Sequence, residues 1–115
     1  MKNEAEIKHI ELSIEDAKES VALRDAFLRL KENKDFKAII DKAYFEHEPT
    51  RLAFLTADPS QFGTNEQAAI QRQIAGIGSL RMFLISLMHQ GNMAEKAIES
   101  HEERLEEIHS GESEE

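Results

Sequence analysis

Apolar side chains recur every three or four positions along most of this sequence, which is the spacing of amphipathic α-helices. The first such stretch covers residues 14–31, and Ser13 directly before it is the predicted N-cap. A polar turn follows, in which Asn33 or Asp35 can cap a second helix. The pattern therefore predicts two successive helices in the first part of the chain.

Pro49 interrupts this pattern, because proline lacks a backbone N–H and fits the first turn of a new helix. A short helix is therefore predicted over residues 49–57, followed by a loop. Thr64 and Gln67 then have the spacing of a capping box, which marks the start of a helix. This helix is predicted to continue to about residue 90.

Gly91-Asn92 is a typical helix stop and separates a last predicted helix over residues 93–108. Residues 1–12 are predicted to form a loosely ordered arm, because the apolar positions at their end alternate as in an extended strand. Residues 109–115, rich in serine and glutamate, are predicted to be a disordered acidic tail.

These elements predict an all-α fold, a compact array of four to five helices around one core with a disordered acidic C-terminal tail. Residues 13–108 are expected to form a single domain, because a chain of 115 residues buries only one modest core. The helices over 14–31 and 64–90 are the expected main layers. The side chains expected to be largely buried are Leu23, Phe27, Ile74, Ile77 and Leu84.

Two glycines, Gly76 and Gly78, lie inside the predicted helix over 64–90. Glycine inside a helix costs roughly 1 kcal/mol relative to alanine. We expect that cost to be offset by the close approach of another helix, with a local bend as the main alternative. A dinucleotide-binding loop is excluded, since no strand precedes the pair.

The net charge of −9 is concentrated near the C-terminus. Residues 92–115 contain nine Glu against one Lys and one Arg, a net charge of −7, which leaves −2 for the first 91 residues. No cluster of Lys and Arg is present, so direct nucleic-acid binding is not expected. No apolar stretch approaches the ~20 residues of a membrane helix. Cysteine is absent, which excludes disulfides and thiolate metal sites.

Two Glu-x-x-His pairs, Glu6 with His9 and Glu106 with His109, have the spacing found in di-iron carboxylate bundles. Both pairs lie in charge-rich segments near the ends of the chain, and such sites need two further glutamates. We therefore interpret them as surface charge and expect no metal and no cofactor. No serine lies in a nucleophile elbow, so an enzyme is not expected either.

The predicted helix over 93–108 carries a coiled-coil-like row of side chains at spacings of three and four. Its members, Ile98, His101, Leu105 and Ile108, are the candidate partner interface. The row can pack on the chain's own core or on another chain, and a homo-oligomer is one of the arrangements left open.

Four segments resemble a family of small acidic all-helical proteins of tailed bacteriophages. They are VALRDAFLRL (21–30), DFKAII with YFEHEPTRLAFLTADP (35–59), IAGIGSLRMFL (74–84) and MAEKAIESHEERLEEI (93–108). The resemblance covers most of the chain, and none of its motifs is catalytic. Members of this family are encoded near head and portal genes and mostly lack an assigned activity.

The resemblance implies a non-catalytic phage structural or virion-assembly protein that acts through helix–helix contacts. Its expected partner is a protein, with a phage structural protein as the first candidate. Two alternatives stay open. One is a phage-encoded inhibitor whose acidic helix binds a basic surface of a host protein; the less favoured one is a di-metal carboxylate protein. The expected location is the host cytoplasm, with incorporation into the virion left open.

Overall fold

The computed structural model describes residues 3–114, and side chains as far as residue 111. Within this range the chain forms helices and short turns without any strand, which confirms the all-α class. The elements are α1 (Glu4–Lys31), α2 (Lys34–Phe36), η1 (Lys37–His47), α3 (Glu48–Thr56), η2 (Pro59–Gln61) and α4 (Thr64–Glu114). Met1 and Lys2 of the expected arm and Glu115 of the expected tail lie outside the described residues.

Two compact units divide the chain. The terminal unit joins Met1–Phe27 to Leu87–Glu115, and the central unit is Leu28–Ser86. Each unit has its own cluster of buried apolar side chains. The predicted compact array of four to five helices around one core is therefore wrong. The physical reason is that the apolar side chains of α1 and of α4 are shared between the two units, so they do not gather in one core.

The predicted stop at Gly91-Asn92 is wrong, because α4 continues through it to Glu114. A glycine that ends a helix usually adopts a positive φ, and no described glycine does so here. The predicted helices over 64–90 and 93–108 are thus one element. The disordered tail is also wrong for residues 109–114, which form the last turns of α4.

At the other end of the chain, α1 begins at Glu4 and passes through Ser13, so Ser13 is not an N-cap. Residues 4–12, expected to be a loose arm, are the first turns of this helix. Glu4 and Glu6 lie in its first turn, where negative charge is favourable to the helix dipole. The buried side chains of Ile10 and Ile14 show that this segment packs rather than projecting into solvent.

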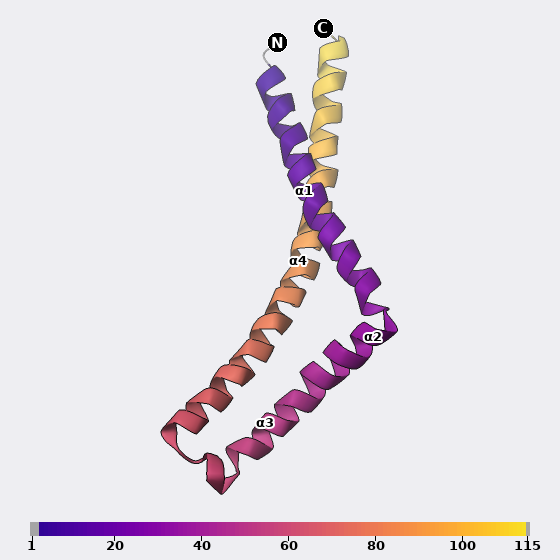
Figure 1. Ribbon diagram of the computed structural model, residues 1–115. Helices are drawn as coiled ribbons and strands as arrows, with labels where there is room; N and C mark the ends of the chain where they lie inside the picture. Colours follow the sequence, from indigo (N-terminus) through magenta and orange to yellow (C-terminus); the bar gives the residue numbers. More distant parts are fainter. Residues whose placement is uncertain (1–2, 115) are drawn as a thin grey trace. The chain divides into compact units, whose positions relative to one another are not determined.

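In the terminal unit, α1 and the last part of α4 run in opposite directions, so that the start of α1 and the end of α4 lie at the same end (Figure 1). Ile10, Ile14 and Ile108 form the buried cluster, and three half-buried apolar side chains pack against it. Phe27 is also buried, as predicted, but Leu23 is 57% exposed. This pairing of helices places the start and the end of the described chain next to each other.

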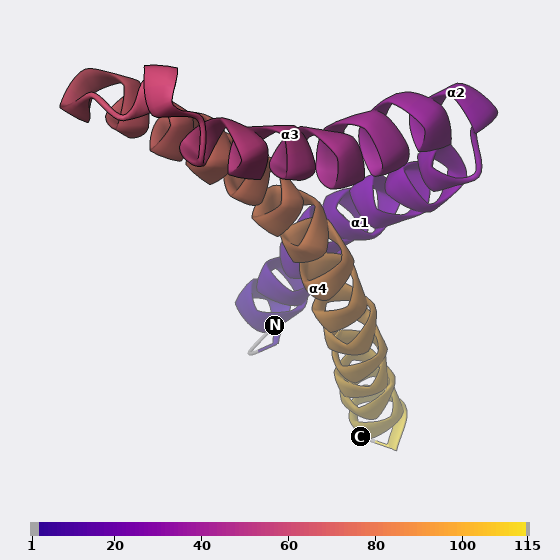
Figure 2. The same cartoon turned by 90° about the horizontal axis from the view of Figure 1, so that it is seen from below.

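In the central unit, α2, η1 and α3 follow one another along one helical path, and α4 turns back beside α3 after η2 (Figures 1 and 2). Leu52, Ile70 and Ile77 form its buried cluster, with Tyr44, Phe45 and Leu55 packed against it. Burial of Ile77 is confirmed. The predicted burial of Ile74, which is 37% exposed, is wrong, and Leu84 is half-buried.

Two cap signals of the central unit have different outcomes. Asn33 caps α2 as predicted, because its side chain accepts the backbone N–H groups of Asp35 and Phe36 at 2.9 and 3.0 Å. The Thr64–Gln67 capping box is wrong. The Gln67 amide instead donates to the carbonyl oxygens of Gln61 at 2.6 Å and Thr56 at 3.3 Å. It thereby ties the start of α4 to the preceding turn.

η1 is an 11-residue π-helix, with i→i+5 hydrogen bonds, where a second α-helix was predicted. Pro49 does not interrupt it with a loop. The backbone passes directly from η1 into α3, and Pro49 lies in the first turn of α3, where its missing N–H is tolerated. The N–H of Glu48 still bonds the carbonyl oxygen of Ala43, five residues back. The break expected at Pro49 is therefore a change of hydrogen-bond pattern.

Candidate protein-binding surface

The predicted partner interface on α4 lies against α1 of the same unit. Ile108 is 5% exposed and belongs to the buried cluster, and Ile98 and Leu105 pack against that cluster. His101 is half-buried. The structure thus brings three of the four predicted side chains together with Ile10 and Ile14. Of the two arrangements left open by the sequence, this is the one in which the row packs on its own chain.

An arginine at each end of the terminal unit joins α1 to α4. The Nε of Arg104 donates to Glu6 Oε1 at 2.9 Å, and its Nη1 donates to Glu107 Oε2 at 3.3 Å. The bond to Glu6, followed by the bond to Glu107, raises the pKa of Arg104 above its usual value. This pairing fixes the register of the two helices near the ends of the chain.

Arg24 makes the second connection, at the point where α1 meets Gly91. Its Nη1 donates to Asn92 Oδ1 at 2.9 Å and to Glu95 Oε2 at 3.0 Å, and its side chain is only 10% exposed. The hydrogen bond to Glu95, followed by that to Asp25, raises the pKa of Arg24 above its usual value. A Cβ on Gly91 would collide with the Arg24 side chain. Gly91 therefore permits the close approach of the two helices.

The close approach predicted at Gly76 and Gly78 is wrong, because a Cβ on either residue would have nothing within 4 Å. Both glycines lie on exposed parts of α4. Sequence reasoning assigned close helix packing to this pair and a helix stop to Gly91, whereas the structure places the close packing at Gly91. Glycine spacing alone does not say which face of a long helix is covered.

The two Glu-x-x-His pairs both lie in the terminal unit. Glu6 is engaged by Arg104, whereas His9, Glu106 and His109 are exposed. Among the described residues, no three or more His, Cys, Asp or Glu side chains are grouped so that they could hold a metal ion.

Exposed large apolar side chains are unevenly distributed between the units. Of the twelve found in the described part of the chain, Leu12, Leu23 and Met93 belong to the terminal unit. The other nine belong to the central unit: Leu28, Leu30, Ile39, Phe54, Phe62, Ile74, Met82, Phe83 and Ile85. Exposed apolar side chains mark a protein-binding region where they form a contiguous patch, so the central unit is the part of the described chain that offers the most side chains for such a contact.

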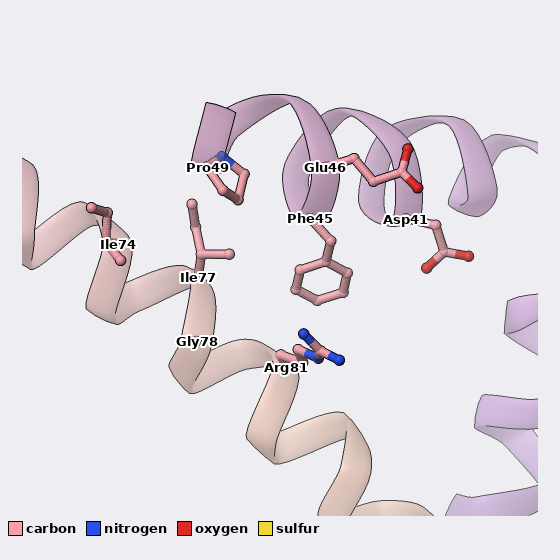
Figure 3. Close-up of a pocket in the computed structure, with 8 residues that line it drawn as sticks. All are labelled: Asp41, Phe45, Glu46, Pro49, Ile74, Ile77, Gly78 and Arg81. Atoms are coloured by element: carbon pink, nitrogen blue, oxygen red, sulfur yellow. The ribbon is translucent and has the colours of Figure 1, made fainter. Parts of the chain in front are cut away.

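A cleft of about 490 Å³ lies in the central unit between two helical segments. η1 and α3 contribute Asp41, Phe45, Glu46 and Pro49, and α4 contributes Ile74, Ile77, Gly78 and Arg81. Figure 3 shows Phe45 pointing from η1 toward α4, with both carboxylates on the η1 side and the Arg81 guanidinium on the α4 side. The cleft therefore combines an apolar floor with opposite charges on its two sides.

The π-helical backbone explains how η1 presents this set. Because each hydrogen bond spans five residues, side chains four and five positions apart share one face. Phe45 and Glu46 are four and five positions after Asp41, so all three fall on the side that faces α4. In an α-helix, Glu46 would be turned further away from this face.

Sequence reasoning missed the cleft, because it assigned the α4 stripe around Ile74 and Ile77 to a closed core. The usable signal was the break in that stripe. Gly78 and Arg81 continue it at helical spacing, and a fully buried stripe rarely carries an unpaired arginine. The two residues mark the part of the stripe that stays open.

Comparison with protein-family models, with curated proteins and with solved structures gives no significant match to this chain. Within residues 3–114, none of the helices combines the length and the apolar character that crossing a membrane requires.

Proposed function

We propose that this chain is a non-catalytic phage structural or virion-assembly protein that acts through helix–helix contacts with other protein chains. The observation that carries the proposal is the concentration of exposed apolar side chains in the central unit, nine of the twelve in the described residues. Burying one such side chain is worth about 1.5–3 kcal/mol, so even a few of them can support a stable contact. The resemblance to phage proteins supplies the setting, the host cytoplasm and the assembling virion.

Phe54 offers the sharpest test, because its side chain is 74% exposed and its replacement leaves the buried cluster intact. The phage would carry Phe54→Ser, with Leu12→Ser as the matched control, since Leu12 is 58% exposed and belongs to the terminal unit. Quantitative mass spectrometry of purified virions and assembly intermediates should find the wild-type chain and L12S, but severalfold less F54S. Absence of the wild-type chain from all particles, or equal retention of both variants, would overturn the proposal.

A second candidate function is an inhibitor that binds a basic surface of a host protein. It is supported by a row of exposed glutamates on α4, of which Glu99, Glu102, Glu103 and Glu106 have no ion pair within the described residues. Glu102→Lys with Glu103→Lys should then abolish cross-linking to a host protein early in infection, while F54S should leave it unchanged. The opposite pattern would favour the assembly function.

A further inference from the structure

We propose that the cleft of the central unit binds a second copy of this chain in a two-fold symmetric dimer. The inference rests on the proposed function, because it names one partner for the same helix–helix surface. The contact would bring η1 and α4 of one copy against α4 and η1 of the other.

Charge complementarity identifies this occupant. Asp41 and Glu46 lie on one side of the cleft and Arg81 on the other, and within the described residues none of these three side chains has a hydrogen bond or ion pair. In a two-fold interface the same patch meets itself, so that a contact of one residue with another occurs twice. Arg81 of each copy can then pair with Asp41 and Glu46 of the other. A foreign partner would need both charges in this pattern, whereas a second copy necessarily carries them.

The α4 side of the cleft has the shape that a close helix–helix contact needs. Gly78 has no side chain, and a Cβ there would have nothing within 4 Å, so a second helix can approach the α4 backbone. Ile74, 37% exposed, lies four residues before Gly78. Ile85, 48% exposed, lies four residues after Arg81 and continues the same face. Ile74 and Ile85 thus flank Gly78 and Arg81 along this face of α4.

Charge reversal tests the pairing directly. R81E and the double variant D41K/E46K should each raise the dimer dissociation constant by about tenfold or more, since like charges would face each other twice. An equimolar mixture of the two variants should form a heterodimer of about wild-type affinity, because both contacts again join opposite charges. Arg72→Glu is the matched control, as Arg72 is exposed on α4 but does not line the cleft. Sedimentation equilibrium gives the constants, and native mass spectrometry with one isotope-labelled variant identifies the heterodimer.

A glycine pair supplies a second test that keeps every charge. Gly78→Gln places a bulky side chain in the cleft and should weaken the dimer at least as much as R81E. Gly76→Gln is its control, because Gly76 is equally open but does not line the cleft. Both substitutions favour helix, so the variants should fold, and circular dichroism checks this for the charge variants as well. If a charge variant does not fold, the comparison of the two glutamine variants decides.

The outcomes separate this inference from the proposed function. The dimer is overturned if the wild-type chain stays monomeric at about 1 mM. At that concentration only a dimer with a dissociation constant well above about 1 mM would escape detection. Three further results would overturn the dimer. They are equal dimer affinities for R81E and R72E, no heterodimer in the mixture of R81E with D41K/E46K, and binding of a basic host protein by the cleft of a monomeric chain. In each case the proposed function still stands if F54S is lost from virions.

Discussion

The terminal and central units solve the same problem, the pairing of another helical segment with α4, by different means. In the terminal unit, Arg24 and Arg104 join α1 to α4 through ion pairs of 3.0 and 2.9 Å. In the central unit, the ion pairs of the described residues stay local, as in Arg51 with Glu48. Its segments are held by the apolar cluster around Leu52 and by Gln67 at the turn.

This difference explains where the exposed apolar side chains lie. Directional polar links hold the two helices of the terminal unit in one register. An apolar cluster has no such direction, and in the central unit it covers only part of the apolar surface of α4. Among the described residues, the terminal unit thus leaves three large apolar side chains exposed and the central unit leaves nine, which gives the central unit the larger apolar surface for another chain to cover.

The largest expected effect is the loss of the central cluster. Leu52 has an exposed fraction of 0%, so Leu52→Ala should lower the free energy of unfolding by about 2–5 kcal/mol. Chemical denaturation measures this loss. Hydrogen exchange should rise first in α3 and the beginning of α4, while the terminal unit keeps its protection. Equal loss of protection in both units would show that the two regions unfold as one and would break the comparison.

Gly91→Ala tests the close approach in the terminal unit. The new methyl group would collide with Arg24 and should destabilise the protein by about 1–3 kcal/mol, although alanine favours helix more than glycine. Gly111→Ala is the control on the same helix, because nothing lies within 4 Å of that position. A G91A variant as stable as G111A would mean that the two helices are not in close contact there.

What the sequence predicted well was local. Helical spacing identified the all-α class, and Asn33 caps α2 as its side-chain chemistry indicates. These features depend on residues within one or two turns of each other. They hold whatever the rest of the chain does.

What failed depended on partners that the local sequence pattern does not include. The local sequence predicts a helix stop at Gly91, but the structure packs Arg24 against it. The local sequence likewise predicts that Gln67 is a capping residue, but its side-chain amide donates to the carbonyl oxygens of Thr56 and Gln61. Ser13 reads as an N-cap, yet the packing of Ile10 and Ile14 carries the helix past it. The cleft was missed for the same reason, since only the folded chain brings Asp41 and Arg81 to one place.

Gly76→Ala should have a smaller effect of the opposite sign. Because its added Cβ would meet nothing within 4 Å, the substitution should stabilise the protein by about 0.5–1 kcal/mol through helix propensity. Thermal and denaturant midpoints should both rise. A decrease would mean that this face of α4 is covered, which contradicts the open central surface and would make the two units alike.

The smallest expected effect is a dependence on pH at the turn of the central unit. The backbone N–H of Ser60, then its hydroxyl, donates to Asp58 and holds the pKa of that carboxyl below its ordinary value of 3.8. The folded state thus favours the ionised form. The resulting stabilisation is fully present above the ordinary pKa and is lost as the pH falls through the lower pKa of the folded state.

Asp58→Asn keeps an acceptor for Ser60 but cannot titrate, so it should be slightly less stable than wild type at pH 7. This difference in thermal midpoint should vanish in strong acid. A difference that stays constant from neutral to acidic pH would show that the charge of Asp58 does not stabilise the turn. The contact between this turn and α4 would then depend on the Gln67 hydrogen bonds and the apolar cluster alone.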